Sequence, residues 1–124
     1  MELLLRKGAP TEAINHNDTP LYLAAWSGHI DTVELLLKEG ALIETLGKNN
    51  NTPLHLAARN GHVGVVELLI EKGASLEALN KYANTPLHLA AWNGHTGAVR
   101  LLREKGAPID VMNRDNTSPL HLAI

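Results

Sequence analysis

The chain has 124 residues, a formal net charge of −2 and no cysteine. This length fits one domain, and the lack of cysteine excludes disulfides and zinc sites built on thiolates. The slightly acidic balance gives no reason to expect nucleic acid as a partner, and no apolar run approaches the ~20 residues that a membrane-spanning helix needs. We therefore expect an intracellular protein that does not insert into a membrane.

One six-residue motif recurs four times along the chain. It begins at Thr19, Thr52, Thr85 and Ser118, which are each 33 residues apart, and it reads Thr-Pro-Leu-His-Leu-Ala in its second and third copies. The first and second units agree at 18 of 33 positions and the second and third at 19 of 33, which excludes coincidence. We interpret residues 1–124 as a single array: a partial repeat at 1–18, full repeats at 19–51, 52–84 and 85–117, and the start of a truncated repeat at 118–124.

Each unit predicts a helix, a turn, a second helix and an extended finger. In the second unit, Thr52 is a suitable N-cap and Pro53 fits the first helical position, while Gly61 and Gly73 end the two helices. Neither helix is long enough to be stable alone, so neighbouring units must stack. In chain order we expect helices at 20–27, 30–39, 53–60, 63–72, 86–93 and 96–105, with no strands beyond short pairings in the fingers.

The period, the repeated motif and the Gly-His pairs that follow it resemble the ankyrin repeat over the whole chain. The resemblance implies an all-α solenoid of helix-turn-helix units with projecting β-hairpin fingers. The family usually has glycine at the finger tip, where this chain has Asn17, Asn50, Ala83 and Asn116. Asparagine tolerates a positive φ, but alanine does not, so the Ala83 turn is expected to be either different or strained. The first finger, from Gly8 to Thr19, is one residue short.

The seven histidines invite a metal or catalytic interpretation, and we reject it. Six of them fall on the repeat, where the resemblance implies that they hold turns and fingers by hydrogen bonds: His29, His55, His62, His88, His95 and His121. The chain has neither a nucleophile elbow nor a phosphate-binding glycine loop. One carboxylate per repeat, Glu12, Glu44, Glu77 and Asp110, is more consistent with hydrogen bonding at the base of each finger than with acid–base catalysis. We expect no enzyme activity, no cofactor and no metal.

The function implied by the resemblance is protein binding through the concave face and the fingers. Two positions before each Gly-His pair vary between repeats, and so do the finger tips; tryptophan, tyrosine and arginine, the residue types most frequent in binding hot spots, occur there. The expected partner-binding residues are Trp26, Ser27, Lys48, Asn49, Asn51, Arg59, Asn60, Lys81, Tyr82, Asn84, Trp92, Asn93, Arg114 and Asp115. One cation per finger, at Lys48, Lys81 and Arg114, would attract an acidic partner over a short range.

Two alternatives remain open at this point. A structural array, natural or engineered, with no partner of its own would show the same repeats. The ends of the sequence also read as half-units, a second helix from Glu2 to Leu5 and a first helix from Leu120 to Ile124, each with exposed leucines. Such ends predict head-to-tail self-association of the isolated chain or, failing that, frayed termini.

Overall fold

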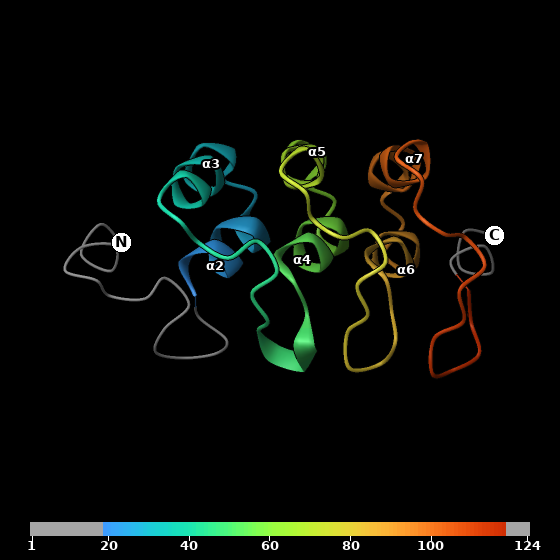
Figure 1. Ribbon diagram of the computed structural model, residues 1–124. Coiled ribbons are helices and arrows are strands. Elements are labelled where there is room, and N and C mark those ends of the chain that lie inside the picture. The colour runs from blue at the N-terminus through green and yellow to red at the C-terminus, as the bar shows by residue number, and fades with distance from the viewer. Residues whose placement is uncertain (1–18, 119–124) are drawn as a thin grey trace.

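The structure, a computed structural model, describes residues 19–118. Six α-helices lie in this range and form three helix pairs side by side (Figure 1). They are α2 (Pro20–Ser27), α3 (Ile30–Lys38), α4 (Pro53–Arg59), α5 (Val63–Glu71), α6 (Pro86–Trp92) and α7 (Thr96–Glu104), and one turn of 3₁₀ helix, η1, covers Lys48–Asn50. The six helices predicted between residues 20 and 105 are confirmed, with each end within one residue of its expected place.

The helices form two layers. The first helix of each pair lies in one layer, in the order α2, α4, α6, and the second helix lies in the other, in the order α3, α5, α7 (Figure 1). Each of these helices begins where the sequence predicts. Thr19, Thr52 and Thr85 are N-caps whose side-chain oxygens accept a hydrogen bond from the first turn, and a proline follows each of them.

The core lies between the two layers and is built from small and aliphatic side chains. Alanine pairs such as Ala57 and Ala58 are fully buried on the first helices, which allows neighbouring repeats to approach closely. Leucines such as Leu54 and Leu69 are 1% exposed or less, and burial of one such side chain contributes roughly 1.5–3 kcal/mol. The short helices therefore owe their stability to their neighbours in the array.

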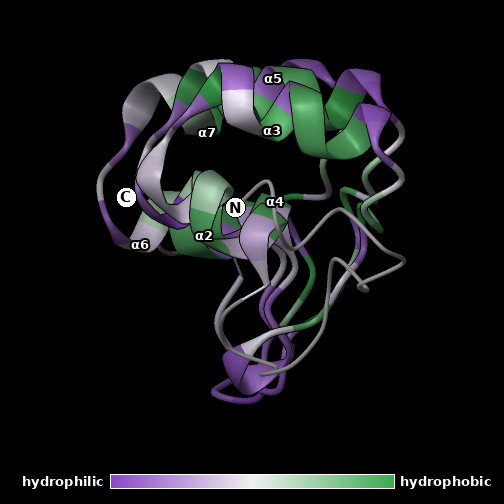
Figure 2. Ribbon diagram, turned by 90° about the vertical axis from the view of Figure 1, so that its left-hand side faces the viewer, coloured by the Kyte–Doolittle hydropathy of each residue, from purple (hydrophilic) through white to green (hydrophobic). Residues whose placement is uncertain are grey.

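The fingers project from the layer of first helices (Figure 2), and within residues 19–118 none of them contains a β-strand. Each described finger reverses within five residues and is closed by backbone hydrogen bonds within the loop, such as those from the Asn80 N–H to the Asn84 carbonyl, 3.1 Å, and from the Ala83 N–H to the Asn80 carbonyl, 2.9 Å. Between adjacent fingers there is one backbone–backbone hydrogen bond each, from the Lys81 N–H to the Asn49 carbonyl and from the Arg114 N–H to the Tyr82 carbonyl. The expected β-hairpins are therefore not confirmed in residues 19–118, because reversals as short as these leave no room for consecutive ladder bonds.

The Ala83 turn is strained rather than different. Asn50, Ala83 and Asn116 have φ angles of 60°, 62° and 60°, so all three fingers share one left-handed residue at the same place. An alanine in this region costs roughly 1–2 kcal/mol relative to glycine, because its Cβ approaches the following carbonyl oxygen.

Several expectations lie outside the described residues. They are the short first finger with Asn17, the carboxylate of Glu12, the ring of His121, and the two terminal half-units on which self-association depends. Within residues 19–118, no helix combines the length and the apolar character that crossing a membrane requires.

Candidate interaction site

The histidines of the repeated motif hold the fingers in place. The Nδ1 atom of His55 accepts a hydrogen bond from the Thr52 N–H, 3.0 Å, and its Nε2 atom lies 2.8 Å from the Asn84 carbonyl oxygen. Because Nδ1 is an acceptor here, Nε2 carries the proton and donates to that carbonyl. His88 repeats both contacts with Thr85 and Thr117. The structural role expected for these two rings is confirmed, and burial lowers the pKa of both, that of His55 to about 4.

Asparagine side chains join one finger to the next. The Oδ1 atom of Asn80 accepts from the backbone N–H groups of Tyr82 and Asn84, and its Nδ2 donates to Oδ1 of Asn51 at 2.9 Å. Asn113 repeats this pattern and donates to Oδ1 of Asn84 at 2.7 Å. Asn51 and Asn84 are thus only 6% and 4% exposed. Their amide groups already bind the neighbouring finger, so a direct contact of these two residues with a partner stays a prediction.

The finger at residues 47–51 is supported differently. Tyr22 occupies the place that His55 and His88 have in the later repeats, and its hydroxyl donates to the Lys48 carbonyl oxygen, 3.3 Å. Gly47 occupies the place of Asn80, and a Cβ atom there would overlap the Tyr22 ring. Burial raises the pKa of Tyr22, and the side chains of Asn51 and Arg59 oppose this shift. The tyrosine and the glycine therefore form a matched pair.

Large side chains are exposed at the ends of the first helices. Trp26 is 52% exposed and Trp92 is 62% exposed, and Arg59 occupies the same position in the repeat between them. The end of α2 is bound to the next repeat, because the Trp26 carbonyl accepts hydrogen bonds from Asn60 Nδ2 at 2.8 Å and from His62 Nε2 at 2.9 Å. Asn60 therefore stabilises the scaffold through this hydrogen bond, and its contact with a partner stays a prediction.

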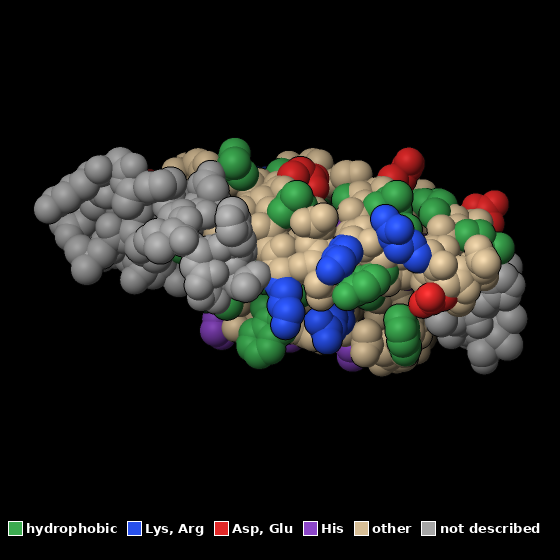
Figure 3. All heavy atoms as spheres, turned by 90° about the horizontal axis from the view of Figure 1, so that it is seen from below, with side chains coloured by type: hydrophobic (Ala, Val, Ile, Leu, Met, Phe, Trp, Pro, Cys, Tyr) green, Lys and Arg blue, Asp and Glu red, His purple; other side chains and the backbone are tan. Residues whose placement is uncertain are grey.

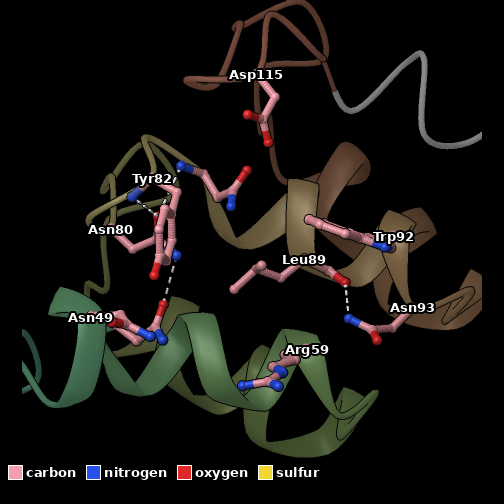
Figure 4. Close-up of a pocket in the computed structure, with 10 residues that line it drawn as sticks. Asn49, Arg59, Asn80, Tyr82, Leu89, Trp92, Asn93 and Asp115 are labelled. Carbon is pink, nitrogen blue, oxygen red and sulfur yellow. Dashed lines mark hydrogen bonds between the residues drawn. The ribbon is translucent and has the colours of Figure 1, made fainter.

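Three neighbouring depressions share Arg59, and we call them together the Arg59 groove. The depression that contains most of the predicted partner-binding residues has a volume of about 390 Å³ and lies between the finger tips and α6 (Figure 4). There Tyr82 projects from its finger toward Leu89 on α6 (Figure 4). This depression is lined by Asn49, Asn51, Arg59, Asn80, Tyr82, Asn84, Leu89, Trp92, Asn93 and Asp115.

The other two depressions extend the groove toward α2. One, of about 370 Å³, lies between α2 and the finger at 47–51 and includes Leu23, Trp26 and Lys48. The other runs along the helix ends and includes Trp26, Ser27 and Asn93. Leu23, Leu56 and Leu89 were not predicted as lining residues. Their position in the motif is always leucine, so variability between repeats, the signal used for the sequence prediction, misses them.

Positive side chains gather at the centre of the finger face, among apolar ones (Figure 3). The ammonium group of Lys81 lies 5.9 Å from the centre of the Tyr82 ring, within the range of a cation–π contact. The Nε atom of Arg114 donates to the Lys81 carbonyl oxygen, 2.7 Å. Lys48 lines the groove, whereas Lys81 and Arg114 are exposed beside it.

The remaining polar groups include the candidate metal ligands and the carboxylates at the finger bases. No group of three histidine, cysteine, aspartate or glutamate side chains in residues 19–118 is placed to hold a metal ion. The carboxylate of Glu44 accepts a hydrogen bond from the Ser75 N–H at 2.7 Å, which is the role expected for the carboxylates at the finger bases.

The comparisons with protein families agree with this architecture. The family model described as Ankyrin repeat matches residues 16–47 and 49–81, and the model described as Ankyrin repeats (many copies) matches residues 69–123. No curated protein sequence matches the chain closely enough to identify a relative. Since the family matches together cover residues 16–123, the chain belongs to the ankyrin repeat family.

Proposed function

We propose that the chain is a non-catalytic interaction module that binds a protein or a peptide in the Arg59 groove. Ankyrin repeats are in general modules of protein–protein interaction. One observation carries the proposal for this chain: Trp26, Arg59 and Trp92 stand at one repeated position, are exposed, and line depressions that share Arg59. A large aromatic side chain left half exposed loses the free energy of burial, which a bound partner restores.

The exposed and the buried side chains of the site have separate roles in this proposal. Arg59, Tyr82 and Trp92 are the anchors, because such residues supply most of the binding free energy of known interfaces. Asn51 and Asn84 fix the spacing of the fingers through their buried amides. A partner therefore meets a preorganised surface, which reduces the entropy lost on binding.

The test compares two triple variants in capture from a cell extract with quantitative mass spectrometry. In the first variant, Trp26, Arg59 and Trp92 are replaced by alanine; in the control, the exposed Leu35, Arg100 and Arg103 of the outer helices are replaced by alanine. We expect the first variant to lose the captured partner, at about 1 kcal/mol or more for each single substitution, and the control to retain it.

Thermal unfolding separates binding from folding. Trp92→Ala should lower the melting temperature far less than Leu87→Ala, because Leu87 is 1% exposed and Trp92 is 62% exposed. An equal loss of stability in the two variants would place Trp92 in the core and contradict the site. Capture that the first triple variant leaves unchanged would also contradict it, and capture of nothing specific would favour a structural array without a partner.

A further inference from the structure

The Arg59 groove carries a spacing as well as a composition. Trp26, Arg59 and Trp92 occupy the same position in three successive repeats, so they follow one another at the distance between neighbouring first helices. Packed helices lie about 8–10 Å apart. A ligand that runs along the array therefore meets an indole, then a guanidinium group, then a second indole, each separated by roughly 9 Å.

Only one regular peptide conformation repeats at this distance. A polyproline II helix has three residues per turn and a rise of about 3.1 Å, so it presents every third residue to the same side at intervals of about 9 Å. An extended β-strand presents alternate residues at about 7 Å, and an α-helix repeats one face about every 5.4 Å. A strand or an α-helix would lose register with the successive repeats after one or two contacts, whereas polyproline II would keep it.

The charges of the groove determine what its central residue can be. Arg59 lines all three depressions, and Lys48 lines one of them. Of the acidic side chains in residues 19–118, Asp115 is the one that lines any of these depressions, and it does so at the edge away from Trp26. A guanidinium group in this setting favours a carboxylate, with which it can form two hydrogen bonds. The two indoles favour apolar side chains.

We propose that the Arg59 groove binds a polyproline II segment with an apolar residue, an acidic residue and an apolar residue at every third position. The acidic residue pairs with Arg59, and the apolar residues contact Trp26 and Trp92. This inference rests on the proposed function, since it names the partner of that same site. The pattern is the same in both chain directions, so either orientation of the segment satisfies it.

A single-stranded nucleic acid also combines negative charge with flat apolar groups, but it fits this groove less well. Stacking platforms for bases place aromatic side chains at successive bases beside a continuous track of cations. Here Arg59 separates the two tryptophans, and the carboxylate of Asp115 faces the same depression as Trp92, where it would repel a phosphate. The groove thus favours a peptide with one well-placed carboxylate.

A displayed library of random twelve-residue peptides tests the proposal with the full chain as bait. We expect enrichment of peptides in which an acidic residue stands three positions from an apolar residue on each side, with proline frequent between them. The same selection against Arg59→Glu should replace the acidic residue by lysine or arginine at the same spacing. Arg100→Glu, on the outer helix α7, is the matched control and should select the original pattern.

The enriched peptide then gives a quantitative readout through the two tryptophans, which are the only ones in the chain. Titration should change their fluorescence, and Arg59→Glu should weaken the binding by about tenfold or more. Enrichment at another spacing, no enrichment, or the same acidic pattern with Arg59→Glu would overturn the proposal. Binding of an oligothymidylate that depends on Arg59 and displaces the peptide would also overturn it and favour nucleic acid.

Failure of this inference is distinguishable from failure of the proposed function. A natural partner that is lost with the Trp26, Arg59 and Trp92 alanine variant, yet binds through a helix or a folded surface, leaves the interaction module intact and removes the polyproline II segment. Loss of neither the partner nor the selected peptide in that variant removes both.

Discussion

Two fingers of this protein reach nearly the same loop with different residues. In the finger at 80–84, the His55 ring donates to the Asn84 carbonyl from inside the array, and Asn80 closes the loop with its side chain. In the finger at 47–51, the longer Tyr22 reaches the Lys48 carbonyl instead, and Gly47 leaves the space for its ring. Both solutions fix one finger on one helix, but the first depends on a titratable group and the second on a steric fit.

The comparison teaches that the repeat preserves contacts rather than residues. His55 and Asn80 occupy the positions of Tyr22 and Gly47, so neither residue can be exchanged between the fingers without its partner. A buried hydrogen-bonding group that loses its partner costs about 1–3 kcal/mol, and overpacking of a well-filled site costs a similar amount. Each finger is therefore stable as a pair of matched residues.

Low pH should give the largest difference in stability between the two fingers. The pKa of His55 is about 4 in the folded chain, lowered from 6.5 chiefly by burial. Between these two pH values the unfolded chain binds a proton that the folded chain does not. The stability from neutral His55 is therefore present above pH 6.5 and is lost as the pH falls toward 4, by about 3 kcal/mol in total.

Amide exchange between pH 7 and pH 4.5, corrected for its intrinsic pH dependence, measures this loss locally. Protection at Leu56 and Ala58 of α4 should fall, while protection at Ala24 and Ala25 of α2, whose motif has Tyr22, should fall less. An NMR titration that placed the His55 pKa near 6.5, with no loss of protection, would contradict the buried neutral ring.

Exchange of one member of the matched pair should have the next largest effect. Gly47→Asn introduces a side chain where the Tyr22 ring lies, so we expect a loss of about 2 kcal/mol in the free energy of unfolding. The double variant Tyr22→His with Gly47→Asn copies the pairing of His55 with Asn80, and should recover most of this loss. Urea unfolding of both single variants and the double variant gives the coupling free energy. Additive losses would mean that the two residues do not form a pair.

The smallest expected effect concerns the tip of the finger at 80–84. Ala83 has a φ of 62°, where its Cβ is strained, so Ala83→Gly should raise the stability by about 1 kcal/mol. Ala78→Gly is the control, because Ala78 lies just before the same finger without a positive φ and should lose stability instead. Thermal unfolding compares the two variants. If Ala83→Gly also destabilised, the turn would have to relax differently in solution.

The sequence by itself determined the helices and their pairing. Thr52, Pro53, Gly61 and Gly73 act locally, through a capping oxygen, a restricted φ and left-handed glycine conformations, so their effect can be read without the fold. The repeat also placed Trp26, Arg59 and Trp92 at one equivalent position, and the tertiary structure brings them to the Arg59 groove. The local pattern indicated that the fingers exist, but it did not reveal that the fingers within residues 19–118 contain no strand.

Only the tertiary structure decided which polar residues are available to a partner. Asn49 and Asn51 both look like variable finger residues and both line the groove, yet Asn49 is half buried, whereas Asn51 is buried and bound to Asn80. The difference arises from hydrogen bonds between residues 29 positions apart, which depend on the distance between two stacked fingers. The sequence of one finger cannot predict that distance, because the distance is set by the packing of the helices beneath the fingers.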